Sequence, residues 1–406
     1  MGSNAGGRKF LGGTLVTCGV PPKLRVLHAL EAFAGGTERH LLDLVAHVED
    51  AEHVIAVPSV HLGRPTIDAI VRAREIGATV ELVEMTRSPA PHRNAAAITS
   101  MRSLIRRYRP DVVHGHSSLG GAISRLSATG TQVPVAYTPN GLSRATWALT
   151  AERYLRSRTD WLIAVSEGEA EFAAGKRLAP PDRISVIRNG IDLEPLAPLR
   201  PSLRARLGVA ETTPLVGCLG RLTWQKAPEI YAAACGIAAR RIPDAHYLLI
   251  GSGLHEDLVR AELESAGLGD RFHWLDALPG AAAAFAELDL YVLPSRFEGG
   301  PYTPLEAMRA RTATVLTDVA GNSDSVEHGV TGLLVPVDEP EPLADAIVEL
   351  IRDPARRAAF AAAGEERLRM LFDVREMAEQ TAEVYQRLAA DRRGPAKLLR
   401  RAVAAA

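Results

Sequence analysis

Short apolar runs alternate with longer amphipathic stretches along nearly the whole chain. The apolar runs are rich in β-branched and aliphatic residues and are mostly bounded by glycine, proline or asparagine, which is typical of buried strands. Helical patterns lie between them, for example over Thr37–Val48, Ala95–Tyr108 and Leu119–Ala128. The alternation predicts parallel, doubly wound α/β sheets. The expected strands are Leu24–His28, His53–Val57, Thr79–Val83, Asp111–His114, Val133–Tyr137, Trp161–Val165, Ile184–Ile187, Pro214–Leu219, Ala245–Ile250, Phe272–Leu275, Leu288–Leu293, Ala313–Thr317 and Gly332–Val335.

A proline-rich stretch, Leu193–Pro201, interrupts the alternation with three prolines in nine residues. Proline at that density stiffens a connection and prevents a helix or a central strand. The 406 residues are enough for two domains, each with its own core. We therefore expect a loose N-terminal tail over 1–22, α/β domains over 23–195 and 196–375, and C-terminal helices with a basic tail over 376–406. Folds of this kind bind ligands at the carboxyl ends of the strands, so a shared site would lie in the cleft between the domains.

Composition narrows the function classes. The 47 Lys and Arg residues nearly cancel the 48 Asp and Glu residues, so no strong overall field recruits nucleic acid. Cys18, Cys218 and Cys235 stand far apart, without the spacing of a disulfide framework or a structural zinc site, which favours a reducing cytoplasm. No apolar run approaches the ~18 residues of a membrane span. We expect a cytoplasmic globular protein.

The segment Ser295–Met308 carries two acids, Glu298 and Glu306, with seven residues between them and a glycine-rich turn inside. The segment follows an apolar run, and a helical pattern begins at Thr303. A strand, a glycine turn and a helix start place free backbone N–H groups and a positive dipole end together, where phosphate binds well. The acids can accept hydrogen bonds from hydroxyls, so the pattern indicates a ligand with both phosphate and sugar.

A structural interpretation of the same residues is also open. Thr303, Pro304 and Glu306 fit a helix capping box, with Thr303 as the N-cap residue and Glu306 three residues after it. In that case Glu306 satisfies only a backbone donor.

Two glycine clusters and a histidine pair mark other strand ends. Gly36 follows the first strand in a Gly-Gly pair that lets a ligand approach the backbone, whereas Gly251–Gly253 fits a tight turn and lacks the third glycine of a dinucleotide-binding motif. His116 ends the fourth strand and is expected to contact substrate, and His114 is expected to be a packed strand residue. The pair lacks a third ligand nearby, so a metal site is not expected. Leu119 stands where a serine-hydrolase elbow around Ser117 needs glycine, which excludes that motif.

Two cations, Arg221 and Lys226, follow the first strand of the second half. They can neutralise a diphosphate leaving group, Arg221 as a fork of N–H donors and Lys226 as a point charge. Metal-dependent sugar transferases generally carry Asp-x-Asp for a divalent cation, and this chain has no such motif. The cations would therefore take the place of the metal.

These residues together resemble the retaining, metal-independent family 4 glycosyltransferases of the GT-B fold, over roughly Leu24 to Tyr385. The Glu298/Glu306 pair followed by Ala-Met is the most specific part. The resemblance implies two Rossmann-like domains that face a cleft, with the C-terminal helices returning to the N-terminal domain. Supporting segments are Gly35–Glu38, Asp111–His116, Tyr137–Gly141, Val165–Ser166, Arg188–Asp192, Gly220–Arg221 with Lys226, and Thr331–Val335.

The resemblance also implies a role for each site residue. Glu306 would accept hydrogen bonds from the ribose hydroxyls of a nucleotide sugar, and Glu298 would hold the hydroxyls of the donor sugar. Arg221 and Lys226 would bind the diphosphate. His116 would lie near the sugar and the acceptor, and Gly36 near the donor phosphates on the opposite domain. The turn residues that would contact sugar and phosphate are Gly299, Gly300, Pro301, Tyr302 and Thr303.

The expected function is transfer of a hexose from a nucleotide sugar, with UDP as the expected base, to a saccharide or lipid-linked saccharide, with no cofactor and no metal. The segments 116–121 and 133–139 resemble those of members that build capsular or exopolysaccharide units on lipid carriers, which implies an acceptor at the inner membrane face. The arginines at 102, 106, 107 and 109, or the basic C-terminal tail, are candidates for peripheral membrane contact, but a solvated surface is the favoured interpretation of both. A UDP-sugar 2-epimerase-like isomerase and a catalytically silent partner protein stay open as alternatives.

Overall fold

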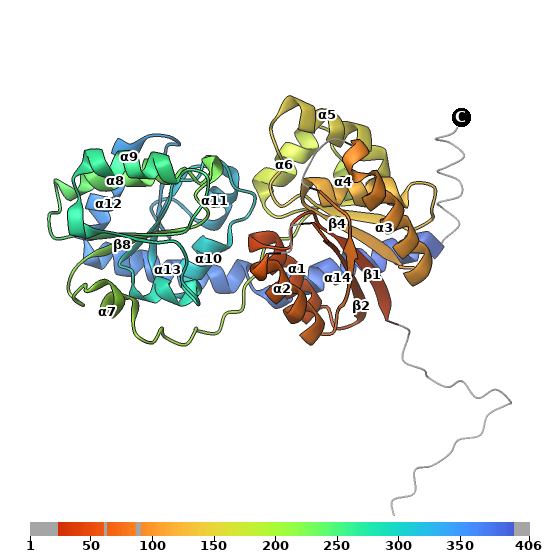
Figure 1. Ribbon diagram of the computed structural model, residues 1–406, viewed down its shortest axis with the longest axis horizontal. Coiled ribbons are helices and arrows are strands. Elements are labelled where there is room, and N and C mark those ends of the chain that lie inside the picture. Colours follow the sequence, from red (N-terminus) through yellow and green to blue (C-terminus); the bar gives the residue numbers. More distant parts are fainter. Residues whose placement is uncertain (1–22, 61–62, 87–90, 394–406) are drawn as a thin grey trace, which may run out of the picture.

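The computed structural model describes residues 23–60, 63–86 and 91–393. The expected N-terminal tail over 1–22 and the last part of the basic tail, 394–406, lie outside the described residues. Within the described parts the chain forms two α/β domains that lie side by side (Figure 1). None of the helices described is long and apolar enough to cross a membrane.

The first domain is built on a seven-stranded parallel sheet in the order β3-β2-β1-β4-β5-β6-β7. Its strands are β1 (Leu24–Ala29), β2 (Ala51–Pro58), β3 (Thr79–Val83), β4 (Val112–His116), β5 (Val135–Thr138), β6 (Trp161–Ala164) and β7 (Ile184–Val186). The α-helices are α1 (Gly35–His47), α2 (Arg64–Glu75), α3 (Ala95–Tyr108), α4 (Ser117–Ala128), α5 (Thr146–Leu155) and α6 (Glu167–Gly175). Short 3₁₀ helices are η1 (Pro91–Asn94), η2 (Arg156–Arg158) and η3 (Pro181–Arg183).

The second domain repeats the plan with a six-stranded parallel sheet in the order β10-β9-β8-β11-β12-β13. Its strands are β8 (Leu215–Leu219), β9 (His246–Ile250), β10 (Phe272–Leu275), β11 (Leu290–Leu293), β12 (Ala313–Thr317) and β13 (Leu333–Val335). The α-helices that follow the connection are α7 (Leu203–Leu207), α8 (Pro228–Ala239), α9 (Glu256–Ala266), α10 (Tyr302–Arg309), α11 (Ala320–Ser325), α12 (Pro340–Arg352), α13 (Pro354–Leu371) and α14 (Val374–Arg393). Short helices here are η4 (Trp224–Lys226), η5 (Gly269–Arg271) and η6 (Ala281–Glu287).

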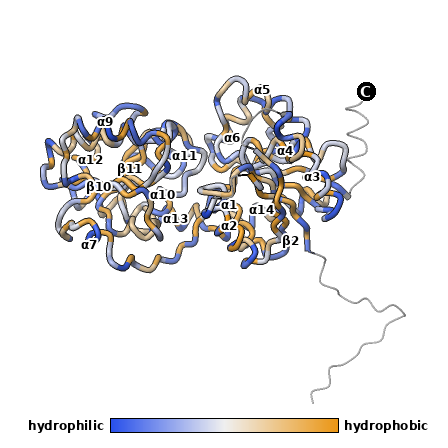
Figure 2. The backbone as a smooth tube through the Cα atoms, in the orientation of Figure 1, coloured by the Kyte–Doolittle hydropathy of each residue, from blue (hydrophilic) through white to orange (hydrophobic). Residues whose placement is uncertain are grey.

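All the strands expected from the apolar runs are present, with bounds that differ by at most about two residues. Both sheets are covered by helices, so their central strands are buried on both faces and consist of nearly continuous apolar residues, whereas the edge strands β3, β7 and β10 are only partly buried. In Figure 2 the hydrophobic residues are concentrated in the segments at the centre of each domain. The fold class predicted from the sequence is confirmed.

The C-terminal helix α14 returns to the first domain, as the resemblance implied. The chain leaves the second domain after α13, and Asp373 pairs with Ile191 in an isolated parallel bridge. From there α14 packs its apolar face, which includes Met377 and Tyr385, against the core of the first sheet (Figure 1). The two domains are thus joined by two chain crossings that lie next to each other. The domain limits expected from the sequence stay predictions.

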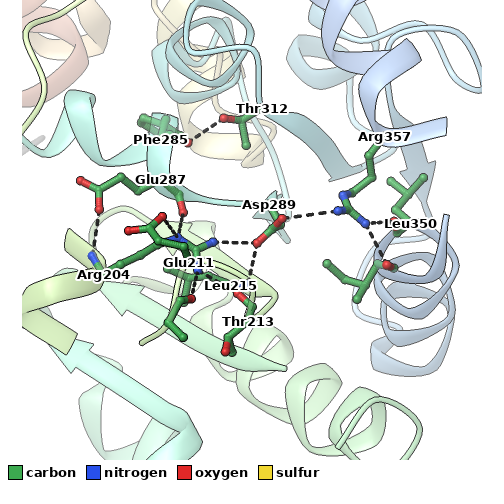
Figure 3. Close-up of polar contacts among 12 residues, drawn as sticks. Arg204, Glu211, Thr213, Leu215, Phe285, Glu287, Asp289, Thr312, Leu350 and Arg357 are labelled. Carbon is green, nitrogen blue, oxygen red and sulfur yellow. Dashed lines mark hydrogen bonds and ion pairs between the residues drawn. The ribbon is translucent and has the colours of Figure 1, made fainter. Parts of the chain in front are cut away.

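One buried arginine fastens the start of the second domain to its sheet. The Arg204 guanidinium of α7 donates to Asp289 at 2.8 Å and to the carbonyl of Glu287 at 3.1 Å (Figure 3). Asp289 also accepts from the backbone N–H of Leu215 on β8 and pairs with Arg357 of α13. A single carboxylate therefore connects α7, β8, β11 and α13.

Candidate functional site

The site lies where the chain order reverses in both sheets. In the first sheet β1 and β4 are neighbours, and in the second sheet β8 and β11 are neighbours. Ligands of doubly wound folds bind outside the carboxyl ends of the strands at such a switch point. His116 ends β4, Arg221 follows β8, and Glu298 follows β11, so the topology gathers the predicted residues at these ends.

The two domains approach each other here at backbone distance. A Cβ atom placed on Gly299 would lie 2.6 Å from the Gly141 nitrogen of the first domain. A Cβ on Gly321 of α11 would lie 2.6 Å from the Gly299 carbonyl oxygen. Glycine is needed at these positions because any side chain would push one backbone off the other.

The glycine turn leads into α10 one residue earlier than expected. Helix α10 begins at Tyr302, its N-cap residue is Pro301, and the cap makes no side-chain hydrogen bond. Thr303 lies inside the helix, so the alternative interpretation of Thr303 as the N-cap residue of a capping box is wrong. Extended Pro301, with ψ of 139°, already ends the turn and sets the helix start. Glu306 is left free to contact groups outside its own helix.

Glu306 contacts the opposite domain. Its carboxylate is paired with the Arg39 guanidinium of α1, which also lies over the Tyr302 ring at 4.8 Å from the centroid. Gly36, one helical turn before Arg39, faces Tyr302 as well, since a Cβ at Gly36 would lie 3.6 Å from Tyr302 Cδ2. The structure thus brings Gly36 against the Tyr302–Glu306 helix across the cleft.

Glu298 is held inside its own domain. Its carboxylate accepts hydrogen bonds from Lys226 Nζ and from Ser295 Oγ, both at 2.6 Å. Only 6% of its side chain is exposed. The predicted sugar-binding acid and one of the two predicted diphosphate-binding cations are therefore adjacent.

Arg221 shares a cavity with the helix α10. The cavity has a volume of about 380 Å³ and extends along the ends of β8 and β9 to Thr303 and Glu306. Arg221 is exposed at its wall. One hollow therefore joins a cation, a helix N-terminus and an acid, the combination expected for a nucleotide.

His116 lies in a buried cluster of histidines at the end of the first sheet. Its Nε2 is 3.1 Å from His28 Nδ1, and its ring is 4.0 Å from the His114 ring, so the two β4 histidines share one face. His114 contacts the hydroxyls of Tyr385 and Thr138, at 2.6 and 2.8 Å, consistent with a packed residue. Burial lowers the pKa of the imidazoles of His28, His114 and His116 well below the usual value, so these rings are neutral near pH 7.

The expectation that His114 and His116 lack a third metal ligand nearby is wrong, because the fold brings another histidine close to them. His28, from β1, brings its ring nitrogen within 4.8 Å of those of His114 and His116. Neutral imidazoles are suitable metal ligands. Hydrogen bonds nevertheless occupy both ring nitrogens of His114 and of His28, and Nε2 of His116. Only His116 Nδ1 is without a partner among the described residues, so a cation bound by all three rings would have to break hydrogen bonds.

Several residues of the site escaped the sequence analysis. Arg39 and His40 follow Gly36 by three and four residues, and helical spacing could have marked them. Asn189 donates to the Gly300 carbonyl at 2.6 Å across the cleft. Glu169, buried in α6, accepts from the backbone N–H of Gly141 at 2.7 Å and holds the loop that faces Gly299.

Two family models match the chain and together cover most of it. The model described as Glycosyltransferase Family 4 matches residues 34–195, and that described as Glycosyl transferases group 1 matches residues 200–367.

Curated relatives match over long stretches. The chain is 30% identical over 394 residues to an alpha-maltose-1-phosphate synthase of Mycolicibacterium smegmatis, covering 88% of this chain and 96% of that protein. It is 32% identical over 256 residues to a lipopolysaccharide core biosynthesis mannosyltransferase of Rhizobium leguminosarum bv. viciae, covering 59% of this chain and 68% of the relative. It is 30% identical over 289 residues to the Escherichia coli UDP-Gal:alpha-D-GlcNAc-diphosphoundecaprenol alpha-1,3-galactosyltransferase, covering 65% and 74%.

Solved structures share the fold. Anabaena HepE in complex with UDP and glucose superposes with a TM-score of 0.77 at 21% identity, over 89% of this chain and 99% of that one. A sucrose-phosphate synthase of Thermosynechococcus elongatus also superposes with a TM-score of 0.77 at 20% identity, over 91% of this chain and 100% of that one. Both structures therefore share the two-domain fold of this chain.

Proposed function

This chain is a family 4 glycosyltransferase with the GT-B fold, and from that premise we propose that it transfers a hexose from a UDP-sugar to an acceptor hydroxyl, with retention and without a metal ion. The observation that carries the proposal is the contact between Lys226 and Glu298 beside the glycine turn. A sugar–diphosphate bond needs a hydroxyl acceptor on one side and a cation on the other. These two side chains, 2.6 Å apart, offer both at the end of β11.

The role proposed for each residue comes from the family resemblance and agrees with where the structure places that residue. Glu306 and the cavity beside it would receive the nucleoside, with the acid accepting from the ribose hydroxyls. Lys226 and Arg221 would stabilise the charge that develops on the diphosphate as the bond to the anomeric carbon breaks. The acceptor oxygen would bond to that carbon on the face the diphosphate leaves, and a phosphate oxygen would take the hydroxyl proton. The protein then contributes positioning and charge stabilisation.

The UDP assignment rests on similarity and has a direct test. A neighbouring structure holds UDP and glucose, and the galactosyltransferase relative is named for a UDP-sugar. In a thermal-shift panel of UDP, GDP and ADP with this protein, UDP alone should raise the melting temperature. A ligand at ~100 times its Kd adds about 2.7 kcal/mol to the native state. A shift with GDP alone would overturn the assignment of UDP as the donor nucleotide. No shift with any of the three would overturn the proposal of a nucleotide-binding site.

Metal independence is tested by a chelator. In this proposal Arg221 and Lys226 take the place of a metal, so excess EDTA should leave the release of nucleoside diphosphate unchanged. Loss of release in EDTA, restored by Mg²⁺, would contradict this part of the proposal. Product analysis separates the alternatives, since a transferase releases diphosphate only with an acceptor, whereas a 2-epimerase-like isomerase alters the sugar without one.

We propose a lipid-linked or polysaccharide acceptor, used at the inner face of the membrane by a cytoplasmic protein. Two relatives are named for lipopolysaccharide core and for a diphosphoundecaprenol-linked substrate. Helix α5 offers a suitable surface: Trp147 and Tyr154 are 63% and 66% exposed. The segment 144–158 carries exposed arginines, and its one acid, Glu152, is buried against Arg125. Aromatic side chains among cations suit an anionic membrane interface.

Vesicle sedimentation tests this surface. The protein should sediment with vesicles that contain anionic phospholipid and not with purely zwitterionic vesicles. Replacing Trp147 and Tyr154 with serine should abolish this, while Trp224→Ser, at a similarly exposed tryptophan of the second domain, should not. Equal sedimentation of both variants would remove α5 from the membrane assignment.

A further inference from the structure

A chain of three hydrogen-bonded histidines runs from a backbone carbonyl to the end of β4. His53 Nε2 lies 3.2 Å from the Val48 carbonyl oxygen, His28 Nε2 lies 2.9 Å from His53 Nδ1, and His116 Nε2 lies 3.1 Å from His28 Nδ1. A carbonyl oxygen only accepts, so His53 must carry its proton on Nε2. Each following ring is then fixed in turn.

The direction of the chain follows from one proton per ring. Burial lowers the pKa of His53, and that of His28 and His116 further, so each ring is neutral and has one N–H and one bare nitrogen. His53 Nδ1 is bare and accepts from His28 Nε2–H, and His28 Nδ1 is bare and accepts from His116 Nε2–H. His116 Nδ1 is therefore bare. It is buried and has no hydrogen-bond partner in the part of the chain that the structure describes.

A second chain fixes His40 from the opposite side of the cleft. Asn189 Nδ2 donates to the Gly300 carbonyl, so its Oδ1 faces His40 Nδ1, at 2.9 Å. His40 Nδ1 must then carry the proton. Burial lowers the pKa of His40 to about 4, so His40 Nε2 is bare as well, and this buried nitrogen likewise has no partner among the described residues.

The two bare nitrogens belong to neighbouring rings. His40 and His116 pack edge to face, with centroids 5.5 Å apart. Two acceptors cannot satisfy each other, and a buried acceptor without a partner destabilises the fold. The pair lies between the end of β4 and the glycine turn that Asn189 contacts, so a group bound in the cleft is well placed to supply the missing donors.

We propose that His40 and His116 form a paired acceptor site for hydroxyl groups of the bound sugar. His28, His53 and Asn189 act as positioning residues that fix the two tautomers through the carbonyls of Val48 and Gly300. The inference rests on the proposed function and deepens it, because it adds His40 to the residues that contact substrate and explains why a buried histidine chain ends at the cleft.

Nitrogen-15 NMR on histidine-labelled full-length protein tests the tautomers directly, because bare and protonated ring nitrogens have well-separated shifts. The free protein should show bare Nδ1 in His53, His28 and His116 and bare Nε2 in His40. Among UDP-glucose, UDP-galactose and GDP-mannose, the one that binds should move the bare signals of His40 and His116 towards the hydrogen-bonded position. The matching diphosphate alone should leave them in place. A protonated Nδ1 in His116 of the free protein would overturn the proposal.

Matched variants test the positioning role. His28→Leu removes the acceptor for His116, whereas His28→Asn can place Oδ1 where Nδ1 was. The leucine variant should give a mixed His116 tautomer and lose about tenfold of the extra affinity for nucleotide sugar over diphosphate, and the asparagine variant should retain both. His273→Leu, which breaks the 2.9 Å His246–His273 pair of the second sheet, should change neither.

The outcomes separate this inference from the proposed function. Diphosphate binding without any sugar-dependent response of His40 and His116 would overturn the paired acceptor site and leave the transferase intact. No binding of any nucleotide would overturn both. If His28→Leu fails to fold, the wild-type spectra and His28→Asn still decide.

Discussion

At the scale of single residues, the buried histidine cluster lowers the stability of the fold but provides polar groups for a ligand site. His28, His40, His114 and His116 are at most 1% exposed, and burial lowers the pKa of each imidazole. An apolar core would pack here without this penalty, since the fold needs no histidine to form its sheet. The placement of these rings at the β1/β4 switch point is what a ligand site requires.

This burial predicts acid sensitivity. Unfolded histidines bind protons below about pH 6.5, whereas the buried rings do not, so stability is fully present above that pH and falls as the pH drops below it. Each buried histidine should contribute up to about 1.4 kcal/mol per pH unit. Urea denaturation at about pH 7.5 and about pH 5.5 measures the slope, and His28→Asn should reduce it by one histidine's share. A free energy of unfolding that stays level over this range would contradict the account.

At the scale of elements, the cleft depends on backbones that touch. The turn after β11 is pressed between the Gly141 loop and α11, because Gly299 has backbone atoms on both sides. Helix α6 supports that contact, since its Glu169 carboxylate holds the N–H groups of Gly141 and Leu142. Small residues therefore help to set the alignment of the two domains.

Gly299→Ala should thus separate the domains at the site. Its Cβ would lie 2.6 Å from the Gly141 nitrogen, a distance that only backbone movement relieves. We expect transfer to fall by about 10²-fold or more, because small misplacements are costly in positioning catalysis, with binding of the diphosphate to the second domain kept. Steady-state release of diphosphate and calorimetric binding measure the two effects. Gly175→Ala, with open space around its Cβ, is the control, and equal activity of the two variants would refute the close contact.

A second element-scale prediction concerns Arg204. Removing the Arg204 guanidinium would deprive the Asp289 carboxylate of one partner. It would also leave three backbone carbonyls, those of Ala210, Thr213 and Glu287, without this donor. Arg204→Met should destabilise the second domain by about 3–5 kcal/mol, the usual cost of breaking a buried ion pair. Chemical denaturation measures the change, and Arg206→Met, at an exposed neighbour of α7, should stay near wild type. A loss below about 1 kcal/mol would show that Asp289 finds another partner.

At the scale of the whole molecule, those features of the fold that depend on neighbouring residues could be predicted from the sequence. Strands appear as apolar runs because both sheets are covered by helices, and the proline-rich connection separates the two patterns. The helical pattern placed the start of α10 at Thr303, one residue late, because Pro301 is the N-cap residue and the helix begins directly after it. The sequence also indicated Glu298 and Lys226 as site residues, since each lies in the segment that connects a strand end to the next α-helix.

Contacts between distant segments could not be read in this way. Arg39 meets Glu306, and Asn189 meets Gly300, only because two crossings of the chain bring the domains face to face. His28 is 88 residues from its partner His116, and only the strand order places them together. Predicting these contacts requires knowing how whole domains pack together, and the hydrophobic periodicity of the sequence carries no information on that packing.

The central claim is that the cleft binds a nucleotide sugar through Glu306 and Glu298, and isothermal titration calorimetry tests it most directly. UDP binding should be weakened about tenfold by Glu306→Gln, which removes a charged acceptor, and be nearly unchanged in Glu298→Gln, which should instead lower the rate of transfer. Glu366→Gln, at an exposed position of α13, is the control. Wild-type affinity for UDP and full transfer in both cleft variants would contradict the account.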